Sequence, residues 1–287
     1  MNSDKLKNLA VRTLSGAVLA ALLFGATLLS AWGYVAVLAV VTVVGVWEFY
    51  NLCEACGYRP QRVMGVTLSL VLFCFGASIF ASMVIARSAV AESVILAAIL
   101  YALVAVPSIF VCELFTKNEH PIANVATTFA GVLYVALPAT LMLAVPSMLN
   151  GNGGWNPWYP LCYILIIWAN DVFAYLTGIT LGKHRMCERI SPKKSWEGFV
   201  GGVVAAVGFG LLFGWLLKGD LLLWGGLGAV IAVTGVAGDF VESLFKRSAD
   251  VKDSGAIMPG HGGMLDRFDA LFISAPYALL YLILMNY

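Results

Sequence analysis

Apolar runs long enough to cross a bilayer recur from one end of the chain to the other. A transmembrane helix needs about 20 apolar residues, whereas a transmembrane barrel shows alternating segments of roughly ten. The sequence therefore predicts an all-α fold, a polytopic transmembrane helical bundle of about nine spans. We place five spans in residues 1–150 and four, together with two charged loops, in residues 151–287. The runs lie near residues 13–32, 34–50, 63–85, 93–115, 122–148, 158–179, 199–217, 221–240 and 270–286.

Composition excludes a water-soluble globule. The 287 residues are 61% hydrophobic and 11% charged, with a mean hydropathy of +0.89, whereas soluble domains carry about 25% charged residues. A net charge of +1 predicts no nucleic-acid partner. The pair Cys53 and Cys56 has half of a zinc-site spacing, but no second pair or nearby His completes it, so we predict neither zinc nor a disulfide framework.

The distribution of Lys and Arg predicts the orientation. With a cytoplasmic N-terminus, 15 of the 17 basic residues fall on the cytoplasmic side, and Arg87 and Lys218 are the exceptions. This bias follows the positive-inside rule. The two most basic loops, after the sixth and eighth spans, then face the cytoplasm. We also expect residues 32–34 to form the first turn, and Pro138 and Pro146 to kink or end the fifth span.

Carboxylates gather at the ends of predicted helices. Asp239, Glu242 and Lys246 have i, i+3 and i+7 spacing, so they share one helix face. Asp171 lies inside an apolar run beside Asn170, with Tyr175 one turn further on. An ionisable residue within a span is costly, which makes Asp171 a candidate functional residue, although it could instead hold helices together.

The loop after the eighth span mixes acids, bases and a glycine turn. It reads "KRSADVKDSGAIMPGHGGMLDRFD" from Lys246 to Asp269. If a helix begins at "DRFD", Asp266, Arg267 and Asp269 share its first turn. Carboxylates beside cations suit Mg²⁺ with a polyphosphate, because Mg²⁺ usually binds one or two carboxylates plus phosphate oxygens and water. His261 could orient phosphate, protonate a leaving oxygen or serve only the turn.

The loop after the sixth span offers a second cationic site. "SPKKSWEG" places Lys193, Lys194 and Ser195 just before the seventh span. Backbone N–H groups at a helix N-terminus favour anions, although the spacing of a P-loop is absent. The glycines at 198, 202, 210 and 214 are spaced for close packing between helices.

Residues Ser243–Asp269 resemble the signature of phosphatidate cytidylyltransferases, the CDP-diacylglycerol synthases. The order is Ser, Lys-Arg, Lys-Asp, Pro-x-His-Gly-Gly and Asp-Arg-x-Asp, and every position is filled. "NDVFAY", "SPKKSWEG" and "GDFVES" also resemble motifs of that family. Together they cover about the last 120 residues, whereas the first 150 show only compatible hydropathy.

The resemblance implies a multi-pass enzyme of the bacterial inner membrane that makes CDP-diacylglycerol and pyrophosphate from CTP and phosphatidic acid. It also implies Mg²⁺, K⁺ at a paired metal site, and a homodimer. By position, the catalytic candidates are Asp239, Asp266, Asp269, Lys246 and His261. The metal candidates are Asp239, Asp266, Glu242 and Asp171. The substrate-binding candidates are Lys193, Lys194, Ser195, Arg247, Arg267, Asn170, Asp171 and Tyr175.

The chemistry needs charge neutralisation more than a base. A phosphate monoester has a second pKa near 6 and is already largely ionised at neutral pH, so positioning and electrostatics dominate. The main alternative is a secondary transporter, which also carries acids within spans. Transporters usually show paired repeats, and neither polar motif has a second copy in the first half. A CDP-alcohol phosphotransferase is disfavoured because its D-G-x-x-A-R pattern is absent.

Overall fold

A computed structural model describes residues 3–84, 89–116, 118–150, 154–258, 260 and 262–286. The prediction of an all-α bundle is confirmed: eight helical stretches of the described chain are long and apolar enough to cross a membrane, and α1 adds a shorter apolar stretch, Thr13–Leu29. The elements are α1 (Ser3–Leu29), α2 (Ala31–Ala55), α3 (Arg62–Val84), α4 (Ala89–Phe115), α5 (Pro121–Gly131), the π-helix η1 (Val132–Ala136), α6 (Leu137–Met142), α7 (Val145–Leu149), α8 (Trp158–Leu181), β1 (Arg185–Cys187), β2 (Ser191–Ser195), α9 (Trp196–Leu216), α10 (Leu221–Ser248) and α11 (Leu265–Asn286).

The first turn lies earlier than residues 32–34, where we expected it. The helix breaks at Ser30, which is the N-cap of α2 and accepts a hydrogen bond from the Gly33 amide at 3.0 Å. A serine hydroxyl satisfies an otherwise unpaired amide at a helix start, which explains the position of the break. A Cβ at Gly33 would overlap the Ala26 carbonyl, so this glycine lets the two helices meet closely.

Prolines interrupt the fifth apolar run, as expected. The run is divided into α5, η1, α6 and α7, with Pro138 near the start of α6 and Pro146 near the start of α7. Proline has no N–H to donate and clashes with the preceding turn, so the wider π-helical segment falls just before Pro138. Tyr134 lies in that segment.

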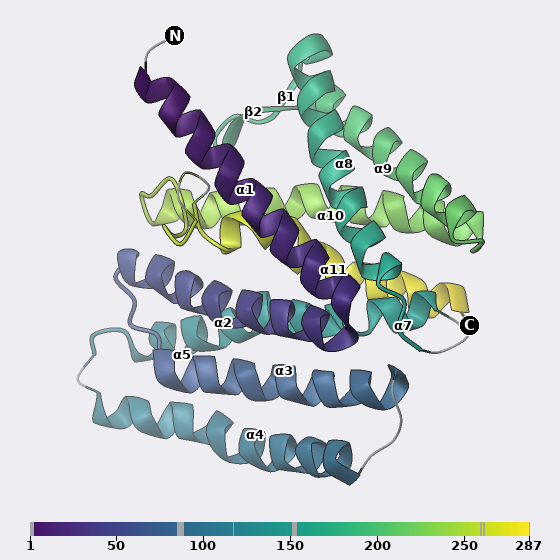
Figure 1. Ribbon diagram of the computed structural model, residues 1–287. Helices are drawn as coiled ribbons and strands as arrows, with labels where there is room; N and C mark the ends of the chain where they lie inside the picture. The colour runs from purple at the N-terminus through teal and green to yellow at the C-terminus, as the bar shows by residue number, and fades with distance from the viewer. Residues whose placement is uncertain are drawn as a thin grey trace.

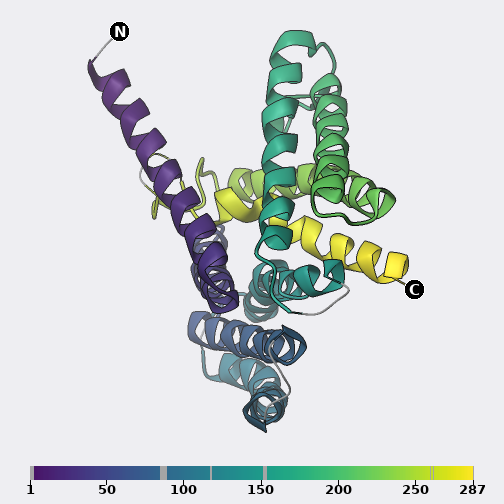
Figure 2. The ribbon, with the colours of Figure 1, turned by 45° about the vertical axis from the view of Figure 1, so that its right-hand side comes forward.

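Two groups of helices cross each other. In Figures 1 and 2, α2, α3 and α4 lie side by side, while the pair α8 and α9 stands across their direction. Helices α10 and α11 lie between the groups: α10 packs on α9 and α11, and α11 also packs on α6. The candidate residues at the end of α10 and the start of α11 therefore lie on helices that contact both halves of the chain.

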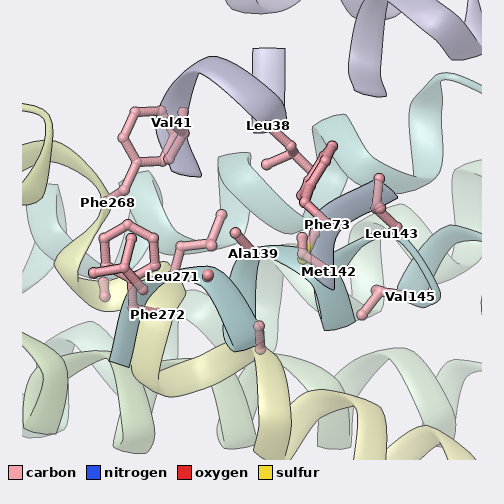
Figure 3. Close-up of a cluster of buried hydrophobic side chains, with 14 of the residues drawn as sticks. Leu38, Val41, Phe73, Ala139, Met142, Leu143, Val145, Phe268, Leu271 and Phe272 are labelled. Carbon is pink, nitrogen blue, oxygen red and sulfur yellow. The ribbon is translucent and has the colours of Figure 1, made fainter. Parts of the chain in front are cut away.

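The apolar core fixes the start of α11. Phe268, Leu271 and Phe272 of α11 are buried in one cluster with Val41 of α2 and Ala139 of α6, as Figure 3 shows. Burying a large apolar side chain contributes about 1.5–3 kcal/mol. The first turn of α11, which carries Asp266 and Asp269, is thereby anchored to helices of the first half.

Glycines bring the site helices together, as their spacing predicts. A Cβ at Gly210 of α9 would overlap the Trp224 carbonyl of α10. At Gly238 of α10 it would overlap the Asp269 carbonyl of α11. Because Gly238 precedes Asp239, this close approach brings the carboxylates of Asp239 and Asp269 to the same place.

Candidate active site

A cavity of about 500 Å³ lies where α1, α8, α10 and α11 meet. Its lining includes six acids and three bases. Its apolar lining comes mainly from α1 and α8. The polar lining is Asp171, Asp239, Glu242, Asp253, Asp266, Asp269, Lys194, Lys246 and Arg267, and the apolar wall includes Gly16, Leu19, Leu23, Ile164, Ile167 and Trp168.

Asp239 lies among these charged side chains. Its carboxylate forms an ion pair with Lys194, which reaches it from β2. Asp269 is close enough to Asp239 and Glu242 to interact with both electrostatically. Asp239 and Lys194 are each about one quarter exposed, so both remain accessible from the cavity.

Lys246 holds two further carboxylates. Its ammonium group lies 2.6 Å from Glu242 Oε2 and 2.6 Å from Asp266 Oδ1. The other Asp266 oxygen accepts hydrogen bonds from the amides of Ser254 and Gly263, at 2.9 and 2.7 Å. Asp266 therefore ties the loop to α11, and its oxygens already have partners.

The basic loop forms a short β-hairpin, which we did not predict from the sequence. Strands β1 and β2 pair antiparallel, with Arg185 opposite Ser195. The amide of Lys183 donates to the Glu197 carboxylate at 3.0 Å and so joins the hairpin to α9. Ser195 is the N-cap of α9 and accepts from the Gly198 amide at 3.2 Å, so the predicted anion site at this helix start is partly filled by the chain itself.

A second cavity, of about 540 Å³, adjoins the first beneath this hairpin. Its cations are Arg185, Lys193 and Lys194, and Asn170, Tyr175 and Ser195 also line it. Asp171, Lys194 and Asp239 line both cavities. These three residues thus mark the boundary where a ligand in one cavity can meet a ligand in the other.

The predicted site residues differ in whether they line the two cavities. Asp171 faces both cavities, and Asn170 donates to it at 3.3 Å. Arg267 reaches the first cavity, whereas exposed Arg247 lines neither. His261 lies outside the described residues.

Two residues of the first half escaped the sequence analysis. Glu48 of α2 is buried and accepts the Leu265 amide at 2.9 Å. Tyr134 lies close enough to Asp239, Glu242 and Asp269 to interact electrostatically, and its buried hydroxyl has no hydrogen-bond partner among the described groups. An acid within an apolar run was a usable signal for Glu48, just as it was for Asp171.

The donor set fits a divalent cation that arrives with a phosphate. Among the described residues, no three His, Cys, Asp or Glu side chains form a complete metal cluster. Acids outnumber bases in the lining of the first cavity, however, and Glu242 Oε1 is buried without receiving a hydrogen bond from a described donor. Mg²⁺ commonly takes one or two carboxylates and completes its shell with phosphate and water.

The fold and the site define a multi-pass helical membrane protein with a carboxylate- and lysine-rich site where its helix ends meet. Residues 10–285 match the model of the cytidylyltransferase family, and the chain belongs to that family.

Several relatives carry the name phosphatidate cytidylyltransferase. One from Synechocystis is 31% identical, over 96% of both chains. One from Mycobacterium bovis is 30% identical, over 88% of this chain and 81% of its own. One from Staphylococcus aureus is 43% identical over 120 residues, which are 41% of this chain and 46% of its own.

Proposed function

We propose that this protein transfers the cytidylyl group of CTP to phosphatidate, giving CDP-diacylglycerol and pyrophosphate for phospholipid synthesis. A phosphatidate oxygen attacks the α-phosphorus of CTP, the bond to the β-phosphate oxygen breaks, and pyrophosphate leaves. The observation that carries the proposal is the pair of adjoining cavities, one with an apolar wall and one with a basic wall, which share Asp171, Lys194 and Asp239.

The first cavity suits the lipid substrate. Leu19, Leu23 and Ile167 offer an apolar surface for acyl chains, while Lys246 and Arg267 of the same lining offer positive charge. A phosphate monoester with its acyl chains would find both cations and hydrocarbon in this cavity. This combination of charge and apolar surface matches the two ends of a phospholipid.

The second cavity suits the nucleotide. Arg185, Lys193 and Lys194 supply positive charge for a triphosphate, which binds such groups through charge-assisted hydrogen bonds. Lys194 contacts Asp239 before substrates arrive. We propose that Lys194 moves from the Asp239 carboxylate to a phosphate of the bound nucleotide. Mg²⁺ would then neutralise the Asp239 carboxylate.

The carboxylates Asp239, Asp266, Glu242 and Asp171 are the proposed Mg²⁺ ligands, with Asp269 close by. Asp269 interacts electrostatically with Asp239, whereas Asp266 is held by Lys246 before a metal binds. Bound Mg²⁺ would neutralise the triphosphate and the departing pyrophosphate. K⁺ at a paired site among the remaining carboxylates is part of the same proposal.

The proposed setting is the bacterial inner membrane, with the site facing cytoplasmic CTP and the protein forming a homodimer. The distribution of basic residues supports this orientation. The homodimer rests on the family resemblance, and the mass of the detergent-solubilised protein measures it directly.

Label transfer tests the reaction. Purified protein, phosphatidate and Mg²⁺ are incubated with CTP labelled at either the α- or the γ-phosphate, and the lipid phase is counted. We expect label in lipid from the α position only, because the β- and γ-phosphates leave together. Label from both positions, or from neither, would rule out cytidylyl transfer. Uptake of CTP into vesicles without lipid labelling would favour the transporter instead.

A further inference from the structure

A carboxylate from the first half of the chain reaches the start of α11. Glu48 is only 4% exposed. Its Oε2 atom accepts the Leu265 amide at 2.9 Å and lies 3.4 Å from the Ser254 hydroxyl. Leu265 is the first residue of α11, where amides lack partners within the helix. Glu48 therefore caps α11 from a distant part of the sequence.

The loop before α11 is shaped around this carboxylate. A Cβ at Gly255 would overlap Glu48 Oε1, and a Cβ at Gly263 would overlap Oε2. Both backbone segments approach the carboxylate more closely than any side chain would permit. The loop and Glu48 thus have complementary shapes as well as a hydrogen bond.

Ser254 joins Glu48 to a candidate metal ligand. Its hydroxyl donates to Asp266 Oδ2 at 2.9 Å, and its amide donates to the same oxygen at 2.9 Å. The Gly263 amide adds a third bond to that oxygen. Ser254, Gly263 and Leu265 are consequently held between two carboxylates, one from each half of the chain.

We infer that Glu48 is a positioning residue that fixes the loop and the first turn of α11, and through them Asp266 and Asp269. The inference rests on the proposed function for what those two carboxylates do. A cation site at Glu48 is the weaker interpretation, because the amide at the positive end of α11 already provides its charge with a favourable partner.

Hydrogen exchange tests the positioning without any turnover. Full-length wild-type protein in detergent is compared with Glu48→Ala, Glu48→Gln and the matched control Glu113→Ala. Glu113 is also a buried first-half carboxylate, and it accepts from Gln61 and Asn124. We expect exchange of peptides covering residues 254–265 to rise about tenfold in Glu48→Ala and less in Glu48→Gln, since a lost hydrogen bond to a charged group has that order of effect. Glu113→Ala should leave these peptides unchanged.

The Mg²⁺ dependence of activity distinguishes a positioning role from simple loss of folded protein. We expect the Mg²⁺ concentration for half-maximal activity to rise severalfold in both Glu48 variants and to stay at the wild-type value in Glu113→Ala. Misfolding alone lowers the amount of active enzyme and leaves this concentration unchanged. If the Glu48 variants match Glu113→Ala in both exchange and Mg²⁺ dependence, the inference is overturned.

A double-mutant cycle covers the case in which Glu48→Ala is poorly stable. Gly255→Ala introduces the overlap with Glu48, so it should lower activity and thermal stability in the wild-type background but much less in Glu48→Ala. Equal effects in both backgrounds would contradict the contact. An inactive wild-type protein would refute the proposed function instead, and hydrogen exchange would still test Glu48.

Discussion

At the scale of single residues, the proposed reaction depends on cations shared between protein carboxylates and substrate phosphates. Lys194 pairs with Asp239, whereas Lys193 is exposed at the second cavity. Successive side chains of a strand point to opposite faces, so these two neighbouring lysines of β2 have different surroundings. Of these two lysines, Lys194 is therefore the one that we propose links the nucleotide to Asp239.

Replacing Lys193 and replacing Lys194 should weaken the reaction in different ways. We expect Lys193→Ala to raise KM for CTP about tenfold with a smaller change in kcat, because it removes one charge-assisted contact made throughout the reaction. Lys194→Ala should lower kcat as well. Steady-state kinetics with CTP varied measure both constants, with exposed Arg189→Ala, between β1 and β2, as the control. Wild-type constants in both variants would leave this loop with a role in topology alone.

Sequence reasoning located carboxylates better than it located their partners. Helical spacing placed Glu242 and Lys246 together, and they lie 2.6 Å apart. The same spacing could not show that Lys246 also holds Asp266, 20 positions away. The partners of Glu48 are more than 200 positions away, so only the folded chain reveals its role.

At the scale of elements, local rules predicted the helices and missed the hairpin. The length of the apolar runs predicted the spans, and the two prolines predicted the interruption of the fifth run. Strands β1 and β2 are short, and β2 is "SPKKS", a sequence with little strand preference. Ser195 caps α9 locally, whereas the contact between Lys183 and Glu197 joins residues 14 positions apart and shows only in the folded chain.

Glycines at the helix contacts provide a matched test of close packing. Gly210→Ala should lower the free energy of unfolding by about 1–3 kcal/mol, because its Cβ overlaps the Trp224 backbone. Gly208→Ala, on the same helix, should be neutral or slightly stabilising, since its Cβ would have open space. Thermal unfolding in detergent measures the difference. Equal Tm values for the two variants would show that α9 and α10 do not meet closely at Gly210.

At the scale of the whole molecule, the two halves meet at the site. Helix α11 packs on α10 and on α6, and Glu48 reaches its first residue. The sequence motifs lie in the last 120 residues and gave no indication that the first half contributes. Hydropathy shows that a helix can enter a membrane, but it does not show which helices pack together.

The orientation of the molecule is open to a direct test. Single cysteines at Lys193 and Lys252, both exposed, are introduced into a variant without the six native cysteines. We expect membrane-impermeant maleimide to label them only from the cytoplasmic side, because both loops carry the basic residues that remain inside. Labelling of either from the outside would separate the site from cytoplasmic CTP.

The most direct test of the whole account is turnover by Asp239→Asn, because Asp239 lies where the two cavities meet. Asn keeps the shape and removes the charge, so we predict a loss of about a hundredfold or more in kcat with normal insertion and purification. The control is Asp220→Asn at the other end of α10, where Asp220 caps the helix and Asn can do the same. This control should stay within about twofold of wild type, as is usual for a conservative change away from a site. If Asp239→Asn instead kept most of its activity at ordinary Mg²⁺, the account of this site would be wrong.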